Sequence, residues 1–273
     1  MTRILKITIL GCGCSTGVPR ADGYWGNCDP NNPKNRRSRC SALFRAYKDA
    51  DTPPTSLLID TSPDFREQAI RAQLTHLDAV LWTHDHADQT HGIDDMRALA
   101  AMGKRQIPGY MDAVTRASLT HRFGYVFTGK LGYPPICTPE ALPPLGESWA
   151  IDGQGGPVPV TTFDQAHGPI RSVGYRIGDV AYSSDISDLP ESSFAALEGL
   201  KVWIVDCLRH APHPTHAHLN KTLAWIARVK PERAILTNMH QELDYEALRQ
   251  ILPAGVEPAY DQMVIETPLT SAF

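Results

Sequence analysis

The segment from Val80 to Gly92 constrains the fold of this chain more than any other. It passes from the apolar run Val80-Leu81-Trp82 directly into T-H-D-H-A-D-Q-T-H-G. A short apolar run bounded by polar residues predicts a buried strand, so these histidines and aspartates follow a strand end. His84 and His86 are two residues apart, and an extended backbone would point both side chains the same way. Because imidazole and carboxylate are common ligands of Zn, Fe and Mn, the segment predicts a metal site.

Short runs rich in β-branched and aliphatic residues recur along the chain. They predict strands at 4–10, 56–60, 78–83, 173–177, 180–184, 201–206, 233–237 and 263–266. Helices are expected at 62–74, where Ser62-Pro63 has the pattern of a helix start, and at 94–102 and 219–229. Several strands end in potential ligands, as at Asp185 and Asn238, and strand ends that meet at one sheet edge are a natural place for a site. The stretches 17–39 and 134–159 are irregular, and we interpret the second as a spacer.

Composition excludes several classes of protein. The 273 residues are 42% hydrophobic and carry a formal net charge of −4, which gives no overall attraction to nucleic acid or to an anionic membrane. No apolar run reaches the length of a transmembrane helix, and the alternation at 4–10 favours a first strand over a signal peptide. Six cysteines without a C-x-x-C pair do not indicate a disulfide framework. We therefore expect a cytoplasmic protein with no membrane partner.

Further segments, together with H-x-H-x-D at 84–88, resemble the metallo-β-lactamase superfamily. The opening G-C-G-C-S-T-G-V-P at 11–19 is similar to the G-x-G-x-S-x-G-x-P motif of the phosphodiesterase branch. The later matches follow in the expected order and are Leu58-Ile59-Asp60-Thr61, His167, Asp185 and the stretch 235–240. Since the matches cover nearly the whole chain, the resemblance implies an α/β protein with the four-layer αββα sandwich of that family, and a single domain over 1–273.

The resemblance also implies two divalent metal ions, Mn or Zn, with Fe as an alternative. The first metal would be held by His84, His86 and His167. Asp185 would bridge the two metals, and Asp88 would bind the second and orient the nucleophile. Two metals roughly 3.5–4 Å apart can share a hydroxide that attacks phosphorus.

The sequence departs from the family pattern at two ligand positions. Gln89 stands where the family has a histidine after the aspartate, and Asn238 stands at the position of the last histidine ligand. Either His91 and His240 restore imidazole ligation through a backbone shift, or the second site is oxygen-rich, which suits Mn better than Zn. Loss of the second metal is a third reading.

Within the family, the run Pro214-Thr215-His216-Ala217-His218-Leu219-Asn220 is similar to a segment of the cyclic-phosphate phosphodiesterases of phosphonate breakdown, and ribonuclease Z is a more distant relative. The match gives His216 the role of proton donor to the leaving group, with His218 as a neighbouring substrate contact. In the loop 17–39, Arg36, Arg37 and Arg39 are candidate phosphate ligands and Trp25 could stack on a base. The alternative is a solvated basic loop.

We therefore expect a phosphodiesterase that acts on a small nucleotide-like or cyclic phosphate ester. The alternatives are ribonuclease Z-like RNA processing, thioester or lactam hydrolysis, a redox di-iron protein, and a catalytically weakened metal- or nucleotide-binding module. The acidic chain argues against RNA, whose binding needs a broad basic surface. A small-molecule substrate, no stable nucleic-acid partner and a homodimer are the expected partners.

Overall fold

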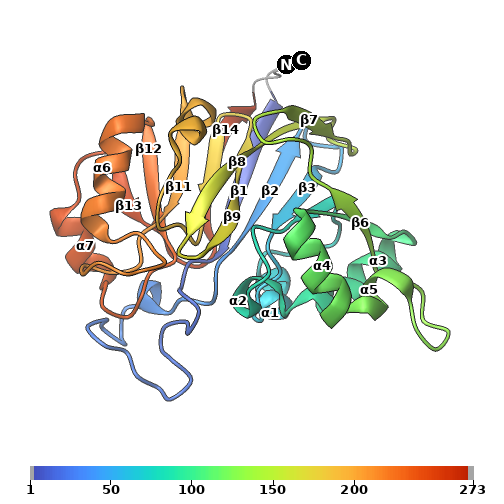
Figure 1. The fold of residues 1–273 in the computed structure, drawn as a ribbon, viewed down its shortest axis with the longest axis horizontal. Helices are drawn as coiled ribbons and strands as arrows, with labels where there is room; N and C mark the ends of the chain where they lie inside the picture. Colours follow the sequence, from blue (N-terminus) through green and yellow to red (C-terminus); the bar gives the residue numbers. More distant parts are fainter. Residues whose placement is uncertain (1–2, 270–273) are drawn as a thin grey trace.

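The computed structural model describes residues 3–269. Two seven-stranded sheets pack face to face, and helices lie on the outer side of each, which gives the four layers of an αββα sandwich (Figure 1). The fold expected from the sequence is therefore confirmed.

The first sheet has the order β14-β1-β2-β3-β4-β5-β6. Its strands β3 to β6 are parallel to one another, whereas β14, β1 and β2 are joined by antiparallel pairings. The bounds are β1 (Arg3–Gly11), β2 (Ser41–Tyr47), β3 (Thr55–Ile59), β4 (Ala79–Leu81), β5 (Ile107–Met111), β6 (Cys137–Ala141) and β14 (Met263–Leu269).

The second sheet has the order β13-β12-β11-β10-β9-β8-β7. Here β10 to β13 run parallel and β7 to β10 pair antiparallel. The bounds are β7 (Ser148–Ile151), β8 (Val158–His167), β9 (Ile170–Ile177), β10 (Val180–Ser183), β11 (Val202–Asp206), β12 (Arg233–Thr237) and β13 (Val256–Pro258).

Helices α1 to α5 lie beside the first sheet, and α6 and α7 lie beside the second (Figure 1). The bounds are α1 (Phe65–Arg71), α2 (Ala87–Thr90), α3 (Arg97–Gly103), α4 (Ala113–Arg122), α5 (Gly124–Thr128), α6 (Leu219–Val229) and α7 (Tyr245–Ile251). Three 3₁₀ helices complete the set, η1 (Pro33–Asn35), η2 (Ile93–Met96) and η3 (Glu191–Leu197). Within residues 3–269, no helix has both the length and the apolar character needed to cross a membrane.

Two apolar cores stabilise these layers. The larger fills the space between the sheets, with side chains such as Ile7 and Tyr175. The smaller joins the first sheet to its helices through residues such as Leu58 and Trp82. Successive side chains of a strand point to opposite faces of the sheet, so a strand of the first sheet contributes to both cores. This packing fixes the carboxyl ends of the strands, where the site lies.

The eight predicted strands are all present, within a few residues of the expected bounds. The helix at 219–229 has the predicted bounds, the one at 62–74 is shorter, and the one at 94–102 is divided between η2 and α3. The interpretation of 134–159 as a spacer is wrong, because it contains β6, β7 and the start of β8. Proline is tolerated in strands mainly at sheet edges, and β6, which carries Pro139, is an edge strand.

The glycine-rich opening after β1 is fixed by a buried carboxylate. Asp261 accepts hydrogen bonds from Cys12 N, Ser38 N and Ser38 Oγ at 3.2, 2.8 and 2.6 Å. Burial raises the pKa of Asp261 to about 6, although these donors act against the shift. Gly11 is required here because a side chain would meet Arg39 O at 2.2 Å. The opening is thereby held against the strand that begins at Ser41.

Candidate metal centre

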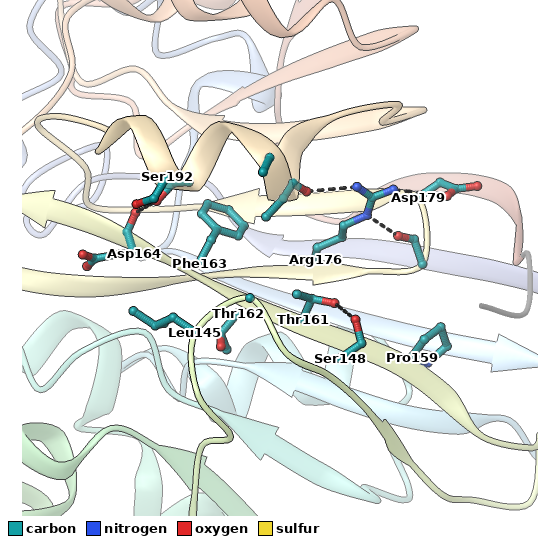
Figure 2. A pocket seen from close by; sticks show the side chains of 15 residues that line it. Leu145, Ser148, Pro159, Thr161, Thr162, Phe163, Asp164, Arg176, Asp179 and Ser192 are labelled. Atoms are coloured by element: carbon teal, nitrogen blue, oxygen red, sulfur yellow. Dashed lines mark hydrogen bonds and ion pairs between the residues drawn. The ribbon is translucent and has the colours of Figure 1, made fainter. Parts of the chain in front are cut away.

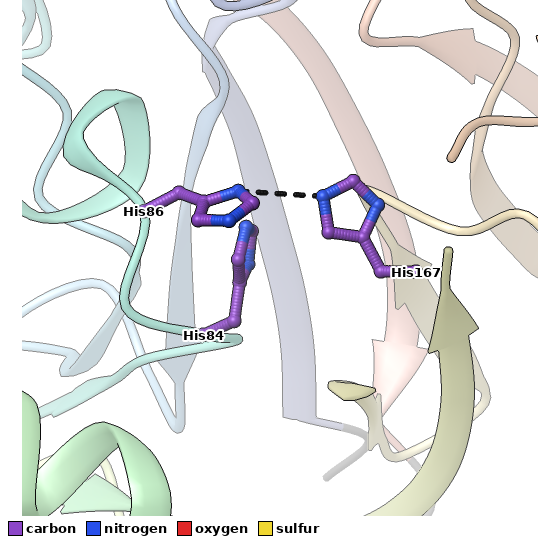
Figure 3. A group of neighbouring side chains, drawn as sticks. All are labelled: His84, His86 and His167. Atoms are coloured by element: carbon purple, nitrogen blue, oxygen red, sulfur yellow. Dashed lines mark hydrogen bonds between the residues drawn. The ribbon is translucent and has the colours of Figure 1, made fainter. Parts of the chain in front are cut away.

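Three imidazoles converge at the carboxyl ends of the strands. His84 and His86 follow β4, His167 ends β8, and one ring nitrogen of each lies within 4.8 Å of the others (Figure 3). His86 Nδ1 is 3.3 Å from His167 Nε2. The three residues come from both sheets, so the sandwich itself builds the cluster.

His84 is oriented by a buried carboxylate on the neighbouring strand end. Asp60 accepts hydrogen bonds from Thr83 N at 2.8 Å and from Thr83 Oγ1 at 2.9 Å. Because Thr83 Oγ1 donates to Asp60, its 3.0 Å contact to His84 Nδ1 requires Nδ1–H to be the donor. That tautomer leaves the lone pair on Nε2, which is the arrangement of a metal-binding imidazole.

His167 is oriented in the same way by a backbone carbonyl. Its Nδ1–H donates to Thr215 O at 2.7 Å, so its Nε2 lone pair also faces the cluster. Thr215 lies in the loop between β11 and α6. The third imidazole is therefore fixed by a backbone group that follows a strand of the second sheet.

Asp185 and His216 extend the cluster. One carboxylate oxygen of Asp185 lies 4.0 Å from His167 Nε2 and 3.8 Å from His216 Nε2. Burial acts to raise the pKa of Asp185, but His84, His216 and His167 outweigh it and lower that pKa to about 2. The carboxylate is therefore an anion among imidazoles.

A second buried carboxylate holds His216. His216 Nδ1 lies 2.9 Å from Oδ2 of Asp206, which is fully buried. Burial acts to lower the pKa of His216, yet Asp206 and then Asp185 and Asp88 raise it to about 9. The ring is thereby fixed with Nε2 toward the cluster and is favoured in its charged form.

Asp88 lies on α2 beside Asp185, and Gln89 contacts both. Burial and then the charge of Asp185 raise the pKa of Asp88 to about 6. The Gln89 amide nitrogen donates to Asp185 Oδ2 at 3.0 Å and to Asp88 Oδ2 at 3.3 Å. A buried carboxylate, Asp185, and a partly buried one, Asp88, thus face each other across an amide.

The residues present fit a divalent cation. His84 Nε2 is buried without a hydrogen-bond partner, although an unpartnered buried polar atom is costly. Burial lowers the pKa of His84 to about 3, so its imidazole is neutral and ready to bind a metal. Asp185 belongs to a second, overlapping group with His167 and His216. The three imidazoles and this carboxylate, with two ring nitrogens already oriented by second hydrogen bonds, suit Zn, Mn or Fe.

The structure does not bring His91 or His240 to this cluster. Residues two apart on a helix do not share a face, so His91 does not point the same way as Gln89. At the end of α2, His91 instead meets Phe123 edge to face, with a ring-centroid distance of 5.6 Å. His240 Nδ1 instead lies 3.4 Å from Glu242. The expectation that these histidines replace the missing imidazoles is therefore corrected.

Asn238 and His218 are near but outside the convergent group. Asn238 Nδ2 lies 3.2 Å from His216 Nδ1. His218 is the N-terminal cap residue of α6, half-buried, and lies outside the groups of described side chains that could hold a metal.

The loop 17–39 does not act as one basic surface. Arg37 is buried and donates to the carbonyl oxygens of His240 and Leu243 at 3.3 and 2.7 Å, so its role is structural. Arg36 is exposed and lies over the ring of Trp25 at 5.6 Å. The placement of Arg36, Arg37 and Trp25 therefore does not support the expectation that they bind substrate. Arg39 is the exception in this loop.

Arg39 lines a cavity of about 570 Å³ that opens beside Asp88. Its Nε lies 3.0 Å from Asp64 Oδ2, and its side chain is partly exposed. Arg20, which pairs with Asp22, lines the same cavity. Arg20 was not among the predicted site residues, and its one signal in the sequence is its position as a cation directly after the glycine-rich opening.

A second cavity, of about 550 Å³, lies against β8 and β9 beside η3 (Figure 2). Thr161, Phe163 and Arg176 line it, and the Arg176 guanidinium donates to three backbone carbonyl oxygens, those of Gly178, Ala196 and Glu198. None of the candidate ligands lines this cavity, so we place the chemistry at the strand ends.

A family model described as the beta-lactamase superfamily domain matches residues 55–239. That range covers more than half of the chain and contains the three convergent histidines. The chain belongs to the metallo-β-lactamase superfamily. Neighbours with this fold are metal-dependent hydrolases.

Relatives of known structure support the assignment. A diphosphatase from the PhnP family is 32% identical, covers 98% of this chain and 99% of its own, and superposes with a TM-score of 0.84. Zn²⁺-bound PqqB from Methylobacterium extorquens is 18% identical, covers 95% and 99%, and has a TM-score of 0.74. The short form of human tRNase Z is 15% identical, covers 95% and 98%, and has a TM-score of 0.66. The last two show the fold alone.

A curated relative named octanoyltransferase, from Porphyromonas gingivalis, is 30% identical over 265 residues. The match covers 94% of this chain but 50% of that protein. The chain thus spans about half the length of this curated relative.

Asp206 and Asp60 are the functional residues that sequence reasoning left without a role. Each stands at or directly after the end of an apolar strand, as Asp185 does. This position at a strand end was the signal in the sequence that could have identified Asp206 and Asp60. The hydrogen bonds to His216 and Thr83 depend on neighbouring strands and loops, which the linear pattern does not show.

Proposed function

We propose that this protein is a metal-dependent phosphodiesterase that acts on a small nucleotide-like or cyclic phosphate ester. The observation that carries the proposal is the convergence of His84, His86 and His167, with one buried, unpartnered nitrogen, beside a cavity lined by arginine. The similarity to a PhnP-family diphosphatase over nearly the whole chain also favours a phosphorus centre.

A divalent cation held by these residues would polarise phosphoryl oxygens and acidify water. We propose Mn, Zn or Fe. Asp88, which lines the same cavity as Arg39, orients the attacking water and accepts its proton. As the new P–O bond forms, the P–O bond to the leaving group breaks.

His216 is the proposed proton donor to the leaving oxygen. Its Nδ1 is anchored on Asp206 at 2.9 Å, so the ring cannot turn away, and its Nε2 faces Asp185. A positioned general acid of this kind contributes about 10²- to 10⁴-fold. Asp206 is a positioning residue because it acts through His216.

Arg39 is the proposed ligand of non-reacting phosphate oxygens, with Arg20 beyond it in the same cavity. A guanidinium binds phosphate oxygens with two parallel hydrogen bonds. A cavity of this size fits a nucleotide-like molecule better than a folded RNA, and the net charge of −4 agrees with that.

The test is hydrolysis by protein stripped of metal and reloaded. Bis-p-nitrophenyl phosphate reports phosphodiester cleavage, and cyclic nucleotide and diphosphate substrates report specificity. A tRNA precursor and an acyl thioester test the RNA-processing and acyl-transfer alternatives. Turnover of the phosphodiester alone is the expected result, whereas metal binding without turnover of any substrate would favour the weakened binding module.

A further inference from the structure

Gln89 occupies the space between the two carboxylates that would share a second metal. It is fully buried, and its Nε2 lies 3.0 Å from Asp185 Oδ2 and 3.3 Å from Asp88 Oδ2. The carboxylates are therefore already bridged by the N–H groups of one neutral amide.

Asn238, the second amide, is also engaged with the protein. It is buried, and its Oδ1 accepts from Cys40 Sγ at 3.8 Å. Its Nδ2 lies 3.2 Å from His216 Nδ1, which itself donates to Asp206. His91 and His240 point elsewhere, as described above. Among the described residues, the one imidazole outside the first three that lies in a group able to hold a metal is that of His216, together with His167 and Asp185. That ring is already anchored on Asp206 and is the proposed proton donor.

An amide nitrogen carries two donor hydrogens and no lone pair for a metal. A cation between Asp88 and Asp185 would therefore have to expel the Gln89 amide or turn it over. Either change breaks two hydrogen bonds to charged groups, one buried and one partly buried. Hydrogen bonds of this kind are among the stronger ones in proteins.

We propose that this protein holds one metal ion per chain, on His84, His86, His167 and Asp185, and that the Gln89 amide takes the place of a second ion. The sequence pattern led us to expect two ions. Gln89 then acts as a positioning residue that holds Asp88 and Asp185 beside each other without a cation. This inference uses the metal site of the proposed function but not its phosphodiesterase activity.

The experiment counts metal in the wild-type protein. The protein is stripped with a chelator, reloaded with excess Mn²⁺, freed of loose metal by gel filtration and analysed by elemental mass spectrometry. We expect about one Mn per chain and the paramagnetic resonance spectrum of isolated Mn²⁺. About two Mn per chain with an exchange-coupled spectrum would overturn the proposal.

The double variant Gln89→His, Asn238→His tests whether these amides are the reason that the chain holds one ion and not two. It is expected to bind about two ions and to give the coupled spectrum, and a count that stays at one in the folded variant would refute the role assigned to Gln89. His91→Ala, outside the cluster, should leave the wild-type count unchanged, and a lower count would contradict the ligand set.

His84→Ala should bind none, and a retained ion would place the metal elsewhere and also contradict the proposal. If the wild-type protein itself bound no metal, the metal centre and the proposed function would both fail. One ion without phosphodiester turnover would instead refute the proposed function alone.

Discussion

Replacing His216 with alanine should divide substrates according to their leaving groups. An alkoxide leaving group, as in a nucleotide-like ester, needs a proton as the P–O bond breaks. p-Nitrophenolate is stable without one. The variant should therefore lose far more turnover on an ester with an alkoxide leaving group than on a p-nitrophenyl ester.

The expected size follows from the geometry of His216. Its ring is anchored by a 2.9 Å contact to a fully buried carboxylate and keeps about 15% of its side chain exposed. A preorganised general acid is worth about 10²- to 10⁴-fold, or about 3–5 kcal/mol of activation free energy. We expect a loss in that range on a cyclic nucleotide, and less than about tenfold on bis-p-nitrophenyl phosphate.

The assay measures kcat and metal content for both substrates. Metal content should stay at the wild-type level, because His216 is assigned to proton donation. Asp206→Asn, which keeps the shape but removes the charge, should show the same division with a smaller loss. Equal loss on both substrates, or loss of metal, would refute the proton-donor role and indicate that His216 is a ligand.

Three further predictions test other parts of the structure. His84→Ala should lose metal and turnover together, and full turnover would contradict the ligand assignment. Arg39→Ala should raise KM for phosphate esters roughly 10- to 100-fold, since a hydrogen bond to a charged group is worth about 1.5–3 kcal/mol; Arg36→Ala is the matched control, and an equal effect would contradict the cavity assignment. Asp261 has a folded-state pKa raised to about 6 by burial, above its unfolded value of about 3.9, so the wild type should lose stability relative to Asp261→Asn as pH rises from about 4 to 6. The free energy of unfolding of the wild type and of Asp261→Asn, measured by denaturant titration at both pH values, tests this. A difference in that free energy that does not change with pH would refute the prediction.

The sequence was most informative where residue type and position act together. The histidines after Trp82 could be assigned as a metal site because a strand end and rare residues coincide. His167 and Asp185 required the family resemblance, since each is a single ligand residue after an ordinary strand.

Other features depend on tertiary contacts that no local pattern encodes. Arg37 looked like a phosphate ligand, but backbone carbonyls of the segment 240–243 bind its guanidinium inside the protein. His91 was misjudged because it follows Gln89 by two residues on α2, a spacing that does not share a helix face, and its ring lies against Phe123. The strands β6 and β7 were missed because they are short and lie in a stretch rich in proline and glycine, which resembles a loop. Of the two, β6 carries a proline, Pro139, which an edge strand tolerates.

The most direct test of the central claim is the rate of bis-p-nitrophenyl phosphate hydrolysis by protein stripped of metal and then supplied with Mn²⁺, Zn²⁺ or Fe²⁺ in turn. A metal centre on His84, His86 and His167 predicts no turnover by the stripped protein and recovery with at least one of these ions. Turnover that survives stripping, or that no ion restores in the folded protein, would contradict it.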